Sequence, residues 1–169
     1  MSASLQVSIR RFAPADWTQL WPLLRATFEA GDTYAYAPDS READIRTTWT
    51  EAPAATFVAC GPGEQVIGTY FIKANQPGLG SHVCNCGYVV APAAQGRGIA
   101  AALCEHSQRE AVEMGFRAMQ FNLVVSTNER AVRLWQRLGF KIVGTLPRAF
   151  HHRQLGYVDA LVFYKELVT

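Results

Sequence analysis

No other segment narrows the possible folds of this chain as much as residues 87–103, GYVVAPAAQGRGIAAAL. An apolar run rich in valine ends at Ala91-Pro92, and a run of good helix formers begins near Gly98. Pro92, Gly96 and Gly98 predict a loop between the two runs, with a backbone that a ligand can approach closely. The segment therefore predicts a strand, a glycine-containing loop and a helix in direct succession.

The loop is a candidate pyrophosphate site, because the first turn of a helix has free N–H donors and a partial positive charge. Arg97 would add charge at its rim, although a plain turn would also place glycine before a helix. The pattern Gly96-x-Gly98-x-x-Ala101 also fits a dinucleotide-binding loop, which needs its first glycine directly after the strand and an acidic residue ending the next strand. Here five residues intervene and the next strand ends in VVST, so the dinucleotide interpretation fails.

The pattern of apolar residues along the chain predicts elements in the order β-α-α-β-β-β-α-β-α-β-β. We expect strands over 5–12, 55–61, 65–73, 82–92, 116–126, 141–146 and 157–167. We expect helices beginning at Pro14 and over 40–49, 96–115 and 129–138, with a loop over 31–40 and a connection around 150–153. Pro22 interrupts the first helix and predicts a kink or a split. The order indicates a mixed sheet with packed helices, in the α/β or α+β class.

Composition excludes several classes of function. A length of 169 residues favours one domain over 1–169. The net charge of +2, without a basic stripe, argues against nucleic-acid binding. No apolar run approaches membrane-spanning length and the N-terminus lacks a signal-peptide core, which predicts a cytoplasmic protein without a membrane partner. The four cysteines are interpreted as reduced, buried side chains, and no metal site is expected.

Two motifs resemble the GCN5-related N-acetyltransferase (GNAT) superfamily. Gln95-x-x-Gly98-x-Ala100 resembles its coenzyme A signature Q/R-x-x-G-x-G/A, and residues 128–140, NERAVRLWQRLGF, resemble its second motif N-x-x-A-x-x-L-Y-x-x-x-G-F. The resemblance implies a mixed, mainly antiparallel seven-stranded sheet with about four flanking helices. It also implies that the parallel central strands HVCNCGYVV and MQFNLVVS splay apart.

The resemblance implies acetyl-CoA as co-substrate, lying between the splayed strands with its pyrophosphate on the loop 95–100. The N–H of Val89 or Val90 would polarise the thioester carbonyl, by the logic of an oxyanion hole. Val90 and Asn85 are the residues expected at the reacting group. The expected cofactor-binding residues are Val89, Val90, Gln95, Gly96, Arg97, Gly98, Ile99, Ala100, Asn128, Ala131 and Trp135.

Proton transfer is not assigned to a carboxylate, because the strand SHVCNCGYVV contains none. His82 is its one strong base and lies far from the splay, so a water relay is the preferred base. Trp135 occupies the position where many relatives have tyrosine, and an indole N–H cannot protonate a thiolate. Trp135 is most simply a core residue, and the acid stays unassigned, with Tyr88 and Cys86 as neighbours.

Three asparagines mark the candidate acceptor site. Asn85 and Asn122 lie on the two splayed strands, either as a satisfied cross-strand pair or as amides that hold a substrate carboxylate or carbonyl. Asn128 is interpreted as a helix N-cap that can also face the cofactor. The setting of the three asparagines resembles yeast acetyltransferases of the proline analogue azetidine-2-carboxylate. Tyr34, Tyr36 and His152 are expected to roof this pocket.

These features predict an N-acetyltransferase that moves an acetyl group from acetyl-CoA to a small, amino-acid-like amine by direct attack. One alternative is an enzyme that acetylates protein N-termini or lysines, which would need an open groove. The other alternative is a catalytically weak module that binds acyl-CoA for regulation. The superfamily resemblance also implies a possible homodimer.

Overall fold

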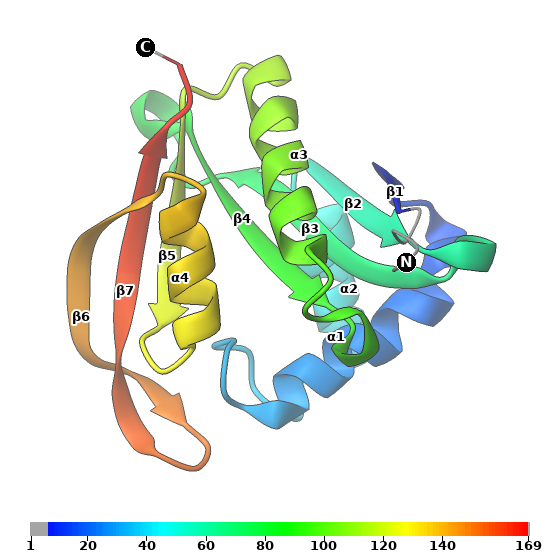
Figure 1. Cartoon of the computed structure of the whole chain (residues 1–169), viewed down its shortest axis with the longest axis horizontal. Helices are drawn as coiled ribbons and strands as arrows, with labels where there is room; N and C mark the ends of the chain where they lie inside the picture. The colour runs from blue at the N-terminus through cyan, green and yellow to red at the C-terminus, as the bar shows by residue number, and fades with distance from the viewer. Residues whose placement is uncertain (1–6, 169) are drawn as a thin grey trace, which may run out of the picture.

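The computed structural model describes residues 7–168, which contain one seven-stranded sheet in the order β1-β2-β3-β4-β5-β7-β6 (Figure 1). The strands are β1 (Ser8–Arg11), β2 (Ala55–Cys60), β3 (Val66–Ala74), β4 (Val83–Val90), β5 (Ala118–Val125), β6 (Lys141–His152) and β7 (Gly156–Glu166). The helices are α1 (Trp17–Ala30), α2 (Glu42–Arg46, continued by a π-helical turn over Thr47–Glu51), α3 (Ile99–Glu113) and α4 (Glu129–Arg137). The order matches the one expected from the sequence, and Leu5 and Gln6 of the expected first strand lie outside the described residues.

The sheet opens at its centre. Every neighbouring pair of strands is antiparallel except β4 and β5. These two pair only where they begin, Val83 with Ala118 and Cys84 with Met119. Figure 1 shows the two strands separating toward their C-terminal ends. The structure therefore confirms the expected mixed sheet, the splayed parallel pair and the four flanking helices.

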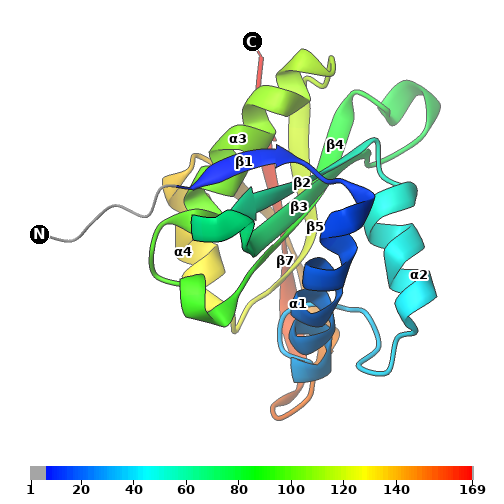
Figure 2. The ribbon, with the colours of Figure 1, turned by 90° about the vertical axis from the view of Figure 1, so that its right-hand side faces the viewer.

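Two apolar clusters hold the helices on the two faces of the sheet. Leu103 of α3 and Trp135 of α4 belong to the cluster on one face. Leu24 of α1 and Trp49, in the turn that continues α2, belong to the cluster on the other face. Figure 2 shows α3 and α4 on one side of the strands and α1 and α2 on the opposite side. The gap between β4 and β5 is thus enclosed by helices from both layers.

The expectation of a kink or split at Pro22 is wrong, since α1 runs unbroken from Trp17 to Ala30. Proline removes one hydrogen bond of a helix interior. Leu20 and Leu24, on either side of it, are completely buried against the sheet. Tertiary packing of this apolar face keeps the helix continuous despite the lost bond.

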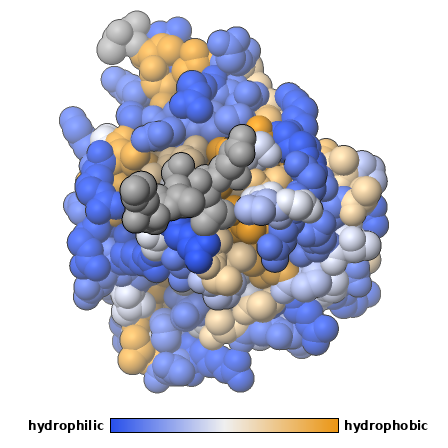
Figure 3. Space-filling model, turned by 45° about the vertical axis from the view of Figure 1, so that its right-hand side comes forward, coloured by the Kyte–Doolittle hydropathy of each residue, from blue (hydrophilic) through white to orange (hydrophobic). Residues whose placement is uncertain are grey.

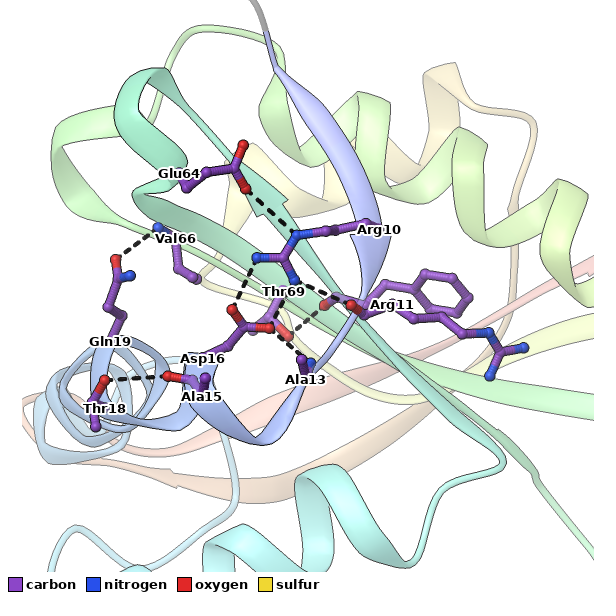
Figure 4. A network of polar contacts seen from close by, with 11 residues as sticks. Arg10, Arg11, Ala13, Ala15, Asp16, Thr18, Gln19, Glu64, Val66 and Thr69 are labelled. Carbon is purple, nitrogen blue, oxygen red and sulfur yellow. Dashed lines mark hydrogen bonds and ion pairs between the residues drawn. The ribbon is translucent and has the colours of Figure 1, made fainter.

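An ion pair fixes the start of α1 to β1 (Figure 4). Arg10 donates two hydrogen bonds to the Asp16 carboxylate, at 2.8 and 2.9 Å, and the Ala13 N–H donates a third at 2.7 Å. The bonds from Arg10 are the main reason that the pKa of Asp16 lies below its usual value. At the other side of the helix start, the Val66 N–H donates to the Gln19 side chain. The entry of α1 is therefore tied to both β1 and β3.

The last hairpin is longer than the sequence indicated. The connection expected around 150–153 is wrong, because Phe150, His151 and His152 belong to β6 and pair with β7. The pairing shifts register between Leu146 and Phe150, where Arg148 takes the left-handed φ of 54°. The bulge lets the strand resume beyond Pro147, which ended the apolar pattern seen in the sequence.

The surface and the cysteines complete the description. All four cysteines are buried and free. The face shown in Figure 3 is largely hydrophilic, with apolar side chains in separate patches. Among the described residues, none of the helices combines the length and the apolar character needed to cross a bilayer.

Candidate active site

A cavity of about 890 Å³ follows the gap between β4 and β5. Its wall is formed by both strands, the first turn of α3, the inner face of α4 and the loop after α1. The sequence-predicted residues on this wall are Tyr34, Tyr36, Asn85, Val89, Val90, Gln95, Gly96, Gly98, Ile99, Ala100, Asn122, Asn128, Ala131 and Trp135. Arg97 and His152 are not on the wall, and the contacts expected of these two stay predictions.

Backbone direction decides which groups of β4 face the gap. Successive residues of a strand point their N–H and C=O groups to opposite sides. The Val83 carbonyl accepts a 2.8 Å hydrogen bond from Asn75, just beyond β3. Odd-numbered residues of β4 therefore bond toward β3, and even-numbered residues face β5. Of the two candidate donors, Val89 is directed to the β3 ladder and Val90 points its N–H into the gap.

Tyr34 donates a hydrogen bond to a backbone carbonyl that has no strand partner, because β4 and β5 have separated at this point. Its hydroxyl donates to the Tyr88 carbonyl at 2.8 Å. Burial raises the pKa of Tyr34 well above its usual value, so the hydroxyl keeps its proton and remains a donor. The ring stacks on Tyr36 at 5.9 Å and meets Phe28 edge-on at 5.4 Å. The loop after α1 is thus fixed against the open edge of β4.

Asn85 bridges the fork where the strands part. Its amide donates to the Gln120 carbonyl of β5 at 2.9 Å, one residue beyond the last paired residues. This bond replaces the backbone bond that continued pairing would have made. Asn85 is buried and its amide has a second N–H. The structure therefore shows the cross-strand bond and leaves the expected catalytic role of Asn85 a prediction.

Asn122 lies in a short chain of amides on the same face of the sheet. Its amide donates to the Asn75 side chain at 2.7 Å, and its oxygen accepts from Gln120 at 3.0 Å. The register of β5 against β7 shifts between Phe121 and Val124, which places Asn122 in a β-bulge at the cavity wall. The bulge aims an exposed polar side chain into the gap.

The glycine loop ends in a helix start that no side chain caps. Gly96 and Gly98 both take a left-handed φ of 78°, which glycine adopts without strain. A Cβ added at Gly98 would meet nothing within 4 Å, so the space in front of it is open. The first turn of α3 has neither a capping side chain nor an acidic residue. Its free N–H groups therefore face the cavity with a partial positive charge.

The second motif forms the opposite wall. Asn128 accepts a hydrogen bond from the Ala131 N–H at 3.3 Å, as a helix N-cap does. Arg130 donates to Gln95 at 3.4 Å and brings a guanidinium to the glycine loop. Trp135 is buried, with ring centroids 5.1 Å from Tyr88 and 5.0 Å from Phe121. Trp135 is therefore a core residue that also closes the inner wall of the cavity.

Tyr88 and Cys86 are poorly placed to act as acids. The Tyr88 hydroxyl lies 2.7 Å from Ser107 of α3, whose side chain is completely buried. Burial raises the pKa of both Tyr88 and Cys86 well above their usual values. The Tyr88 hydroxyl is therefore engaged beneath α3 and not directed at the gap.

The side chain of His152 stabilises the β6–β7 turn. Its Nδ1 accepts from the N–H groups of Gln154 and Leu155, at 3.1 and 3.2 Å. The same turn docks on the end of α1, where Arg153 donates its N–H to the Gly31 carbonyl and its guanidinium to the Glu29 carbonyl. The hairpin thus holds the loop after α1 from outside the cavity.

Sequence reasoning missed several charged or aromatic side chains on the wall. They include Asp32, Phe71, Lys73 and Arg130, and Phe121 and Arg137 were missed as well. Lys73 lies directly opposite Asn85 in the pairing of β3 with β4. Strand alternation places Lys73 on the same face of β3 as Phe71, but a single sequence does not fix the register that sets Lys73 opposite Asn85.

A fork between parallel strands, next to an uncapped helix start, defines an acetyltransferase of the GNAT type. The chain belongs to the acetyltransferase (GNAT) family, whose family model matches residues 17–140.

Individual relatives agree with this assignment. A GCN5-related N-acetyltransferase from Kribbella flavida is 42% identical, with a TM-score of 0.90 over 95% of this chain and 97% of that one. N-acetyltransferase aca1 of Schizosaccharomyces pombe is 38% identical over 120 residues, which are 70% of this chain but only 57% of that protein. A phosphinothricin acetyltransferase from Sinorhizobium meliloti, solved with AcCoA, is 20% identical and has the same fold, with a TM-score of 0.86 over 97% of this chain and 90% of that one.

Proposed function

We propose that this protein is an N-acetyltransferase that moves an acetyl group from acetyl-CoA to the amine of a small, amino-acid-like molecule. The observation that carries the proposal is that two sets of backbone hydrogen-bond donors face one cavity. One is the uncapped start of α3, and the other is the Val90 N–H that the splay releases from the sheet. The first suits a phosphate and the second suits a carbonyl oxygen.

The donor set fits coenzyme A. The open space in front of Gly98 leaves room for a pyrophosphate against the free N–H groups, and Arg130 adds a positive charge beside the loop. The unpaired edges of β4 and β5 offer backbone groups to the amides of the pantetheine arm. The solved relative from Sinorhizobium meliloti holds AcCoA, which supports the same co-substrate here.

The residues of this chain then have distinct tasks. Acetyl-CoA would supply the thioester. A neutral amine attacks its carbonyl carbon, the C–N bond forms as the C–S bond breaks, and the proton lost by nitrogen passes through water to the released coenzyme A thiolate. The Val90 N–H donates to the thioester oxygen, where negative charge develops. The buried Trp135 and the partly buried Tyr88 exclude water from one side of the gap. A coenzyme A thiolate is a good leaving group near neutral pH, so the chain needs no dedicated acid.

A closed acceptor end favours a small molecule over a protein acceptor. Tyr34 is bonded to β4, and Arg153 ties the β6–β7 turn to the end of α1. These bonds cover the region that an open peptide groove would need. Within small acceptors, the resemblance carried by Asn85, Asn122 and Asn128, all on the cavity wall, leads us to expect a cyclic amino acid such as azetidine-2-carboxylate.

The proposal is tested by measuring thiol release from acetyl-CoA with a panel of free amino acids, simple amines and peptides. We expect release with small amino acids and little with peptides. Release with peptides alone would indicate a protein acetyltransferase. Tight acetyl-CoA binding without release across the panel would indicate a regulatory module, and no binding heat in calorimetry would refute the proposal.

The role of Val90 has a matched pair of variants. Val90→Pro removes an N–H that makes no ladder bond, so we expect a folded protein that binds acetyl-CoA but loses about 10²- to 10³-fold in kcat. Val89→Pro removes a bond to β3 and should instead lower stability. Circular dichroism and turnover separate the two effects. An unchanged kcat in folded Val90→Pro would exclude this N–H from catalysis.

A further inference from the structure

We infer that Lys73 binds a carboxylate of the acceptor and so restricts the enzyme to amines that carry an acid group close to the nitrogen. The inference rests on the proposed function and assigns a residue that determines its substrate class. The cavity wall has four charged side chains: Asp32, Lys73, Arg130 and Arg137. Both arginines lie on α4, on the side of the cavity that we assign to the cofactor. Lys73 is therefore the cation on the side where the acceptor would bind.

The Lys73 ammonium has no ion-pair partner within residues 7–168. Among the described residues, no carboxylate lies within ion-pair distance of its ammonium, and Asp32, from the loop after α1, is no exception. Its contact is the Phe71 ring, whose centroid lies 5.4 Å from Nζ. The ring holds the half-buried ammonium over the cavity. Such a group is available to an anionic ligand.

A second donor lies next to the ammonium. Lys73 and Asn85 are opposite each other in the antiparallel pair, so their side chains share the sheet face that carries α1. One N–H of the Asn85 amide bonds to Gln120, which fixes the amide and leaves its other N–H. A fixed amide N–H beside an ammonium matches the two oxygens of a carboxylate.

The distance to the reacting group limits the length of the acceptor. Lys73 leans over Phe71, which lies opposite Gly87, three residues before Val90. Three residues of a strand span about 10 Å. A contact of about 3 Å at each end leaves about 4 Å between the acid oxygen and the thioester oxygen, and the attacking nitrogen must lie beside both. This separation suits an α-amino or α-imino acid and excludes the distant amine of a long chain.

Gly87 forms the floor of the cavity between Lys73 and Val90. A Cβ at residue 87 would lie 2.6 Å from a ring carbon of Phe71 and 3.1 Å from the Tyr34 hydroxyl. Glycine therefore allows Phe71 and Tyr34 to close over β4 between Lys73 and Val90. The acceptor lies on an apolar floor with a cation at one end and a carbonyl-binding N–H at the other.

The test compares azetidine-2-carboxylate, its carboxamide and azetidine as acceptors of the wild type, Lys73→Met, Lys73→Arg and Lys141→Met. Lys141 is an exposed lysine of β6 away from the cavity and serves as the control. We expect Lys73→Met to raise KM for the carboxylate at least tenfold, with little change for the carboxamide. Lys73→Arg should retain most of the preference, and Lys141→Met all of it.

Two results would overturn the inference while leaving the proposed function intact. One is a wild type that turns over the carboxylate and the carboxamide equally well. The other is a Lys73→Met variant that loses activity equally with both. Calorimetry with azetidine-2-carboxylate alone gives a readout without turnover, and binding that Lys73→Met does not weaken would also refute the role. No thiol release with any acceptor would instead count against the proposed function.

Discussion

A charge placed on the first turn of α3 should have opposite effects on stability and on acetyl-CoA binding. Ala100 is the second residue of this helix, is half-buried and lies on the cavity wall. Ala100→Asp adds a carboxylate where the helix has neither an acidic residue nor a capping side chain. A carboxylate at a helix start stabilises by about 0.3–1 kcal/mol. For a chain of this size this raises Tm by about 1–4 °C.

The same carboxylate should repel the pyrophosphate that we place there. Two unit charges about 5 Å apart, at an effective dielectric constant of about 20, repel by about 3 kcal/mol. This weakens binding on the order of 100-fold. The repulsion falls as salt screens the charges. Ala100→Asn adds nearly the same volume without the charge and is the control.

Calorimetric titration with acetyl-CoA and thermal unfolding measure the two effects on the same samples. We expect Ala100→Asp to unfold at a higher temperature than Ala100→Asn and to bind acetyl-CoA far more weakly at low salt. Equal affinities of the two variants, at all salt concentrations, would show that no phosphate lies at the α3 start.

Two further predictions concern the bonds that position the site. Asp16→Asn should lower the free energy of unfolding by about 1–3 kcal/mol, because it breaks the bonds from Arg10 and Ala13. The folded-state pKa of Asp16 is depressed, so the difference in unfolding free energy between wild type and Asp16→Asn should be full above about pH 4 and vanish as the pH falls through that pKa. Denaturant unfolding at a series of pH values measures this difference. A difference that persists in acid would contradict the prediction. Tyr34→Phe should cost about 0.5–1.5 kcal/mol and raise the acceptor KM, since the Tyr88 carbonyl loses its donor. Because the pKa of Tyr34 is raised, the ratio of wild-type to mutant kcat/KM should stay constant from pH 7 to 10, and a ratio that falls in this range would mean that Tyr34 ionises.

Local patterns predicted the parts of the site that are local in the chain. The strand, glycine loop and helix around Gly98 follow from residue types within a few positions of each other, and the Asn128 cap does too. The element order followed for the same reason. The end of β6 did not, because the strand resumes after a bulge whose pairing partner lies on β7.

Contacts between distant strands could not be predicted in this way. Val89 and Val90 are equivalent in the sequence, and only the register of β3 against β4 decides which N–H faces the gap. Lys73 lies twelve positions before Asn85, across a hairpin whose register a single sequence does not fix. The hydrogen bonds of His152 could not be predicted either, because its partners are N–H groups of a turn that was expected elsewhere.

The hydrogen bonds at the fork also explain why the cavity suits this chemistry. Where two paired strands part, carbonyl and N–H groups lose their partners together. The chain supplies its own donors to two of these carbonyls, Asn85 to Gln120 and Tyr34 to Tyr88. The Val90 N–H and the first turn of α3 receive no such partner from the described residues. These two sets of N–H donors match the acceptor oxygens of a thioester that carries a pyrophosphate, which explains why the cavity suits such a ligand.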